Sequence, residues 1–203
     1  EIRDQLVEEL KKQIRKQFGP APLTNEDYGK IINEKHFDRI TGLIAPKKVV
    51  IGGSTDRDRL KIEPTVMNHV TFDDPVMQEE IFGPVLPVLT YDSLDEAIRT
   101  INAGQHPLAL YVFTSDKAAA RKVMSRCRFG GGCVNDTIIH LATSEMGFGG
   151  FGESGMGAYH GKEGFRTFSH YKSIVDKKTW LDLPMRYQPY KSFYAKLLHL
   201  FLR

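Results

Sequence analysis

The feature that most constrains the fold is the alternation of apolar runs and amphipathic segments between residues 85 and 140. Apolar runs at 85–91, 108–113 and 133–140 predict strands, and the segments 93–101 and 116–127 between them predict helices. Apolar strands joined through helices by short links are typical of a parallel sheet that helices cover. The sequence therefore predicts an α/β fold, with a mostly parallel sheet, helices on both faces and a C-terminal extension.

The part of the chain before this region predicts two helices and two extended segments. Residues 2–18 carry an apolar residue at every fourth position, which predicts an amphipathic surface helix. A second helix is expected over 27–43, and the apolar run 49–51 predicts a strand. Residues 62–70 are rich in β-branched side chains around Pro64, and a proline cannot donate to a strand ladder. We therefore expect an edge strand or an extended segment there.

Composition argues against several classes of protein. The 28 lysine and arginine residues exceed the 25 aspartate and glutamate residues by only three, and the charges are interspersed, so no nucleic-acid partner is expected. The seven histidines show no metal-ligand spacing, and no metal site is expected. Cys127 and Cys133 are expected to be structural thiols in a reducing, cytoplasmic compartment.

The run EEIFGP at 79–84 is the first candidate site. Successive side chains of an extended segment point to opposite faces, so one glutamate can face the protein while the next faces water. A carboxylate can accept hydrogen bonds from both hydroxyls of a ribose, and Phe82 lies on the same side as Glu80. The alternative interpretation is a polar loop edge with Phe82 in the core.

The glycine-rich segment 147–157 is the second candidate. It matches the G-x-G-x-x-G pattern in two frames, which raises a phosphate-binding loop, although so many glycines produce such matches by chance. The alternative is a tight irregular loop whose backbone passes close to a ligand or another domain. A hydrolase site at Ser154 is disfavoured, because Met156 stands where a nucleophile elbow needs its last glycine.

The tail 191–203 is too apolar for a free terminus. We expect it to dock on a neighbouring domain or subunit. A weak contact with a membrane surface is the alternative.

Read together, several motifs resemble one known family. The stretch 75–87 (PVMQEEIFGPVLP), the VND run within 132–140, the glycine-rich stretch 148–157 and YHGK at 159–162 are similar to NAD(P)-dependent aldehyde dehydrogenases of the class 3 branch, which acts on fatty and aromatic aldehydes. The similarity covers residues 2–170. It implies the Rossmann-like catalytic domain of that family.

The resemblance implies roles for five residues. Glu80 would bind the hydroxyls of the nicotinamide ribose of NAD or NADP, and Phe82 would pack beside the nicotinamide. Phe148 would line the substrate tunnel, with Leu141 and Ala142 as its neighbours.

The resemblance also implies a division of the chain and a homodimer. Residues 1–140 would form most of the catalytic domain, and 141–203 the glycine-rich loop and a bridging, oligomerising tail. The usual proline before Phe148 is replaced by Gly147.

The family's nucleophilic cysteine, general-base glutamate and oxyanion-binding asparagine would all precede Glu1, as would the cofactor domain. We therefore expect a C-terminal fragment that contains no catalytic residue and is inactive alone. One alternative is an interaction or scaffold module with an enzyme-derived fold. Another is a small dinucleotide-binding protein built on the glycine-rich loop.

Overall fold

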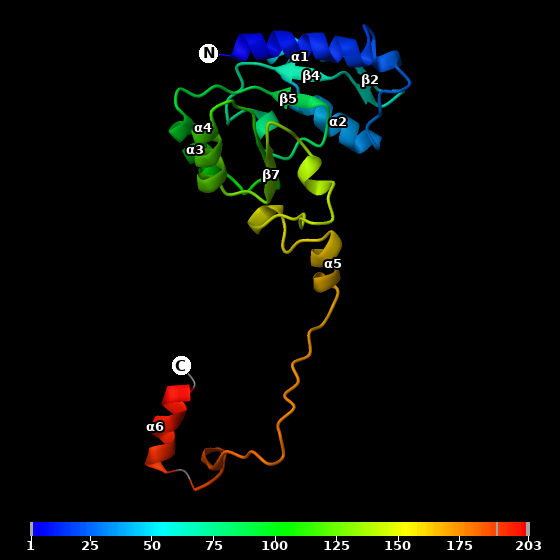
Figure 1. Ribbon diagram of the computed structural model, residues 1–203. Helices are drawn as coiled ribbons and strands as arrows, with labels where there is room; N and C mark the ends of the chain where they lie inside the picture. The colour runs from blue at the N-terminus through cyan, green and yellow to red at the C-terminus, as the bar shows by residue number, and fades with distance from the viewer. Residues whose placement is uncertain (1, 190, 202–203) are drawn as a thin grey trace. The chain divides into compact units, whose positions relative to one another are not determined.

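The computed structural model describes residues 2–189 and 191–201 and divides into two compact units. The first unit is Glu1–Gly104 with Asp116–Cys127, and the second is Gln105–Ser115 with Arg128–Arg203. Figure 1 shows the elements of both units in chain order. The expected division into a catalytic part, 1–140, and a loop and tail, 141–203, is a functional one. The two compact units do not test it, and it stays a prediction.

Two helices open the first unit. Helix α1 spans Arg3–Phe18, close to the prediction, and ends where Gly19 turns the chain with a φ of +77°. Helix α2 spans only Glu34–Leu43, because the Asn33 side chain accepts a hydrogen bond from the His36 amide and caps it there. The expected helix over 27–43 is therefore wrong in its first seven residues.

The residues before α2 are held in an irregular conformation by a contact that is distant in sequence. The Ile31 amide donates to the Leu60 carbonyl over 2.8 Å, and the Tyr28 hydroxyl donates to the Ile62 carbonyl over 2.8 Å. The bond to Leu60 uses the Ile31 amide that a helix would need for its i to i−4 bond, and the Tyr28 bond holds the same segment from its side chain.

The main sheet of the first unit has the order β1-β4-β5. Strand β1 (Val49–Ile51) pairs antiparallel with β4 (Thr65–Met67), and β4 pairs parallel with β5 (Val85–Pro87). The expected edge strand at 62–70 is wrong, since β4 is the buried central strand. Pro64 precedes its first residue and takes no place in the ladder.

A hairpin of two short strands and three single turns complete this region. Strands β2 (Thr55–Asp56) and β3 (Lys61–Ile62) pair antiparallel. The 3₁₀ turns are η1 (Pro22–Thr24), η2 (Pro46–Lys48) and η3 (Pro75–Met77).

The core of the first unit lies between α2 and the β1-β4-β5 sheet. Helix α2 contributes its apolar face at a helical spacing, and the strands contribute their inward side chains. The buried members are Phe37, Ile40, Leu43, Ile62, Met67, Val70, Val76 and Val85.

Helices α3 (Leu94–Ala103) and α4 (Lys117–Arg126) lie together in the first unit. Both were expected, and both begin at a capping side chain, Ser93 and Asp116 respectively. Asp95 of α3 accepts hydrogen bonds from Lys122 and from Arg126 of α4, each over 2.7 Å.

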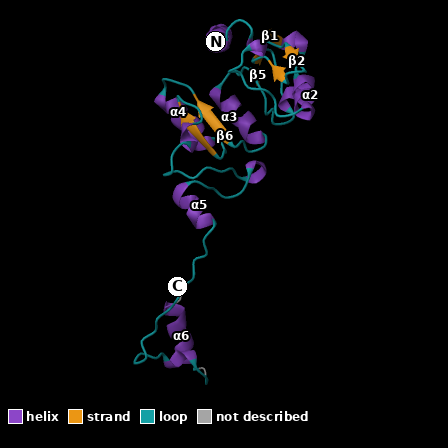
Figure 2. Cartoon of the chain, turned by 90° about the vertical axis from the view of Figure 1, so that its right-hand side faces the viewer, coloured by secondary structure: helices purple, strands orange, loops and turns teal. Residues whose placement is uncertain are grey.

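The second unit is built on a parallel pair, β6 (Ala109–Val112) and β7 (Gly131–Val134), shown from the side in Figure 2. The strand expected over 133–140 ends at Val134, because Asn135 and Ile138 adopt φ values of +59° and +64°. A β-ladder needs extended residues, and left-handed ones end it.

Short helical elements follow β7. They are η4 (Ile139–Leu141), η5 (Gly152–Ser154), α5 (Gly161–Thr167), η6 (Pro184–Arg186) and α6 (Ser192–Phe201). The expected tail segment is thus helical from Ser192 to Phe201, and its last two residues, Leu202 and Arg203, lie outside the described part. In that part, no helix combines the length and the apolar character needed to cross a membrane.

The expected α/β class is confirmed. The two parallel pairs, β4–β5 and β6–β7, occur together with helices, as the alternation of the sequence predicts. In the described residues the strands form three small sheets, and parallel pairing is confined to these two pairs.

Candidate functional site

The EEIFGP loop is held by an arginine of α2. The Arg39 guanidinium donates to the Ile81 carbonyl over 2.6 Å, to the Glu80 carbonyl over 3.4 Å and to the Glu79 carboxylate over 3.1 Å. Hydrogen bonds from a charged donor are stronger than neutral ones. Arg39 therefore fixes the backbone of the two residues that precede Phe82.

The other end of the loop is fixed by packing against the same helix. A Cβ on Gly83 would lie 2.7 Å from Cδ1 of Ile40, which is fully buried, so any other residue here would displace the Ile40 side chain. The Pro84 carbonyl accepts from the Thr65 amide over 2.8 Å, which ties the loop to β4.

The two glutamates of the loop differ in their surroundings. Glu79 pairs with Arg39, whereas the Glu80 side chain is exposed and its carboxylate makes no hydrogen bond or ion pair with any described residue. Both side chains are exposed, so the expectation that one glutamate faces the protein and the next faces water is wrong, and the two differ only in the partner that Glu79 has in Arg39. Both oxygens of Glu80 are free to accept hydrogen bonds.

Phe82 is 77% exposed and has a φ of +47°, a conformation that bulky residues adopt only under constraint. The alternative that placed Phe82 in the core is wrong for this chain. The contacts of Arg39 and Gly83 on either side provide the constraint, and an exposed ring in a strained backbone is typical of a binding residue.

An apolar groove borders this loop within the first unit. It has a volume of about 330 Å³ and lies between α1 and the β4–β5 pair. The side chains of Leu10, Ile14 and Phe18 form one wall, and Gly83 and Pro84 form part of the other.

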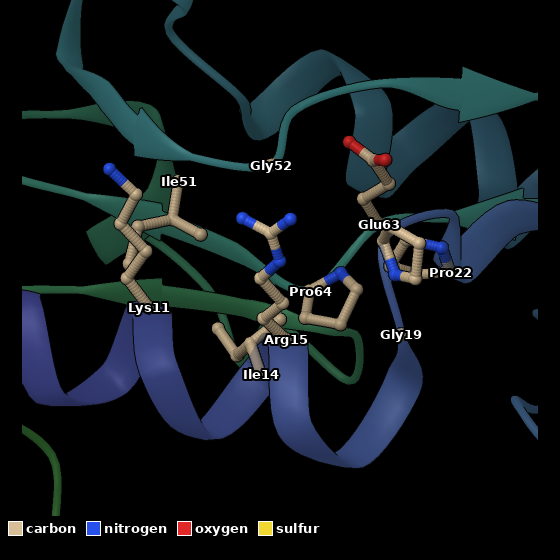
Figure 3. Close-up of a pocket in the computed structure, with 10 residues that line it drawn as sticks. Lys11, Ile14, Arg15, Gly19, Pro22, Ile51, Gly52, Glu63 and Pro64 are labelled. Carbon is tan, nitrogen blue, oxygen red and sulfur yellow. The ribbon is translucent and has the colours of Figure 1, made fainter.

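A second hollow shares Ile14 and Pro64 with the first. In Figure 3, Lys11 and Arg15 extend from α1 toward the segment at Ile51 and Gly52, and Glu63 projects from the facing segment. The mixture of positive and negative charge favours no single class of ligand.

The glycine-rich loop of the second unit is closed on itself. The amide of Phe148 donates to the Tyr159 carbonyl over 2.8 Å, and the Tyr159 amide donates back over 3.0 Å. A Cβ on Gly149 would collide with the backbone of Gly157. Glycine is needed here because two backbone segments touch, which favours the irregular loop over the phosphate-binding interpretation.

An ion pair attaches this loop to the residues before β6. The backbone amide and ring Nδ1 of His106 lie 3.2 and 3.0 Å from one carboxylate oxygen of Glu153. A bond to its own backbone amide, followed by the side chain and amide of His106, lowers the pKa of Glu153 to about 2. Glu153 therefore keeps its charge well into the acidic range.

Two of the three expected substrate residues line different hollows of the second unit. Phe148 borders an apolar cavity of about 540 Å³ together with Leu108 and Phe168. Ala142 borders another, of about 590 Å³, and Leu141 is partly buried in η4. The ring of His140 connects the two, since it lies 5.7 Å from the Phe148 ring and lines the cavity of Ala142.

Two residues that contribute to these sites were not found from the sequence. Arg39 is one of many charged residues on helix α2, and its partners are about 40 positions away, so no local pattern identifies it. The sequence predicts His140 at the end of a strand, and no local pattern indicates that its imidazole is buried beside a thiol.

The chain combines an α/β fold, a carboxylate loop held by Arg39 of α2 and a closed glycine-rich loop. The chain belongs to the aldehyde dehydrogenase family, whose family model matches residues 1–174.

Individual relatives show the same relationship. The chain is 48% identical over 192 residues to the 4,4'-diaponeurosporen-aldehyde dehydrogenase of Staphylococcus aureus, covering 94% of this chain and 42% of the relative. It is 47% identical to the rat dimeric NADP-preferring aldehyde dehydrogenase, covering 87% of this chain and 39% of the relative.

Solved structures agree. The substrate-bound structure of Staphylococcus aureus AldH superposes with a TM-score of 0.91 at 46% identity, covering all of this chain and 44% of that one. The chain thus spans less than half the length of these relatives, and the resemblance to the family is confirmed.

Proposed function

We propose that this chain is part of an enzyme that oxidises an aldehyde to a carboxylic acid with NAD or NADP. The observation that carries the proposal is the loop at 79–84, which Arg39 and Gly83 hold so that Glu80 and Phe82 face outward. Members of the family include an NADP-preferring enzyme and a betaine aldehyde dehydrogenase solved with NAD⁺.

The residues of the loop fit the ribose and nicotinamide of such a cofactor. Both oxygens of Glu80 are free to accept from the two ribose hydroxyls, and the exposed ring of Phe82 offers an apolar surface on the same loop. A nicotinamide bound there would supply the hydride acceptor. Glu80 and Phe82 would orient the sugar and the base, which is a proximity effect and not bond breaking.

Phe148, Leu141 and Ala142 would contribute to the aldehyde-binding surface. The cavity at Phe148 is lined mainly by apolar side chains, which suits an aliphatic or aromatic aldehyde. We further propose that the enzyme takes a small-molecule aldehyde as its substrate, assembles as a homodimer and is located in the cytoplasm.

The catalytic cysteine would come from polypeptide outside this chain. Burial raises the pKa of the Cys127 thiol, although Arg126 opposes this, and Cys127 makes no side-chain hydrogen bond to the described residues. Neither Cys127 nor Cys133 stands where the resemblance places the nucleophile of the family, which is before Glu1. We therefore propose that the 203-residue chain alone is inactive, and NADH or NADPH formed from an aldehyde by the chain alone would contradict this.

The test of the cofactor site uses the full-length enzyme. Replacing Glu80 by glutamine should lower turnover by roughly tenfold or more and change cofactor affinity less, because the carboxylate acts on position. Glu79→Gln is the matched control, since Glu79 is bound to Arg39, and it should lose less. Equal turnover in the Glu80 variant and the wild type would refute the ribose assignment.

The second candidate function is an interaction module. It is favoured by exposed apolar side chains in the C-terminal part, among them Trp180 (80% exposed), Phe193 (64%) and Leu200 (73%). A large exposed apolar surface marks a docking site on a subunit or, in the alternative, a weak membrane contact. Removal of residues 191–203 should then dissociate the dimer into monomers, as measured by sedimentation, without a change in the fold of the remaining chain.

A further inference from the structure

Cys133 and His140 form a buried thiol–imidazole pair in the second unit. The Sγ atom of Cys133 on β7 lies 3.6 Å from Nδ1 of His140 in η4. Cys133 is 8% exposed and His140 is 7% exposed. The other ring nitrogen, Nε2, is buried and has no hydrogen-bond partner among the described residues.

The local backbone is shaped to bring these two groups together. Ile138 has a φ of +64°, which is a strained conformation for a β-branched residue, and it immediately precedes the turn that carries His140. A Cβ on Gly131 would lie 2.9 Å from Cδ2 of His140, so the glycine lets the imidazole lie against β7. Strain of this kind concentrates at functional positions.

The pair lines a cavity of about 590 Å³. Most of the other lining side chains are apolar, namely Val134, Ile139, Ala142 and Met146, with Asp136 and Thr143 as polar members. An uncharged molecule of small size could therefore reach the sulfur atom without burying a charge.

The chemistry of the pair follows from the two ring nitrogens. An imidazole with its proton on Nε2 has Nδ1 available as an acceptor for the thiol proton. A thiolate is the reactive form of cysteine, and an adjacent histidine is a common means of producing it. Nε2, buried and unpartnered, is unfavourable in a purely structural role.

We propose that Cys133 is a modification site for small uncharged α,β-unsaturated carbonyl compounds, with His140 as the base that activates it. Sγ forms a bond to the β-carbon, and the electron pair of the carbon–carbon double bond moves toward the carbonyl. The thiol proton passes to Nδ1 of His140 and then to the α-carbon. The addition needs no oxidant or further reactant, and it is independent of the function proposed above.

The test is the rate of labelling by N-ethylmaleimide, itself a conjugated carbonyl compound, followed by peptide mass spectrometry of the purified full-length protein. Cys127 is the matched control, since it is equally buried at 8% exposure and pairs with no histidine. Cys133 should label faster than Cys127 by about tenfold or more. Equal rates at the two cysteines would overturn the proposal.

The variant His140→Phe separates a base from a purely structural ring. Phenylalanine keeps an aromatic ring of similar size but has no acceptor, so labelling of Cys133 should fall by about tenfold while that of Cys127 stays constant. Loosened packing would instead raise the rates at both cysteines. An unchanged or higher rate at Cys133 in this variant would show that His140 is not the base.

Discussion

Arg39 donates from Nη2 to the main-chain carbonyl of Ile81 over 2.6 Å, and this bond joins helix α2 to the loop that presents Glu80 and Phe82. The guanidinium is only partly exposed, so the bond is protected from water. It explains how an exposed loop keeps a strained phenylalanine in one conformation.

We expect Arg39→Ala to loosen the loop and to lower the free energy of unfolding by about 1–3 kcal/mol, because it leaves two main-chain carbonyls without a charged donor. Denaturant titration measures the stability, and hydrogen exchange of residues 79–84 measures the loosening. Glu79→Gln is the control, because it weakens the carboxylate contact and keeps both carbonyl bonds. Wild-type exchange at the loop in Arg39→Ala would contradict the role of the arginine.

Gly83→Ala should destabilise the protein by about 1–3 kcal/mol, because the new Cβ overlaps Ile40 in a packed core. Ile40→Val removes the nearest atom, Cδ1, and by itself should cost about 0.5–1.5 kcal/mol. The double variant should lose less free energy of unfolding than the sum of the two single losses, as measured by denaturant titration of the wild type and the three variants. If the two losses simply add, the new Cβ at position 83 is not accommodated by removing Cδ1 of Ile40, and the proposed overlap between them is wrong.

The ion pair of Glu153 and His106 should make stability depend on acidic pH. The pKa of Glu153 is lowered from 4.5 to about 2, so its contribution is present above the unfolded value and is lost as the pH falls from 4.5 toward 2. The stability difference between wild type and Glu153→Gln should therefore shrink over this window. Following the denaturation midpoint against pH tests this, and a difference that stays constant through the window would rule it out.

Ser93→Ala should shorten or weaken helix α3, because the hydroxyl oxygen accepts from the Glu96 amide over 3.2 Å at the start of the helix. The loss of such a cap costs about 1 kcal/mol. Ser125→Ala is a suitable control, since Ser125 lies near the end of α4 and its hydroxyl bonds only to the Lys122 carbonyl. Equal stability of the two variants would argue against the cap.

Local patterns predicted much of the secondary structure. Helices α1, α3 and α4 were expected close to their observed bounds, since the helical period of their apolar residues, and for α3 and α4 a capping side chain, are local signals. The failures were at places where distant residues decide. The 27–32 segment is held by hydrogen bonds to the carbonyls of Leu60 and Ile62. The strand expected over 133–140 ends at Val134, because Asn135 adopts a left-handed conformation.

The sequence by itself determined the α/β class, the family and the candidate loops, because motif residues and periodicity are written in neighbouring positions. Only the tertiary structure decided that the carboxylate of Glu79 and not that of Glu80 pairs with Arg39, that β4 is central, and that Cys133 meets His140. These relationships depend on where the folded backbone directs each side chain, even where the two residues are only seven positions apart, as Cys133 and His140 are. No spacing along the chain encodes them, because the geometry that creates them exists only once the core has formed.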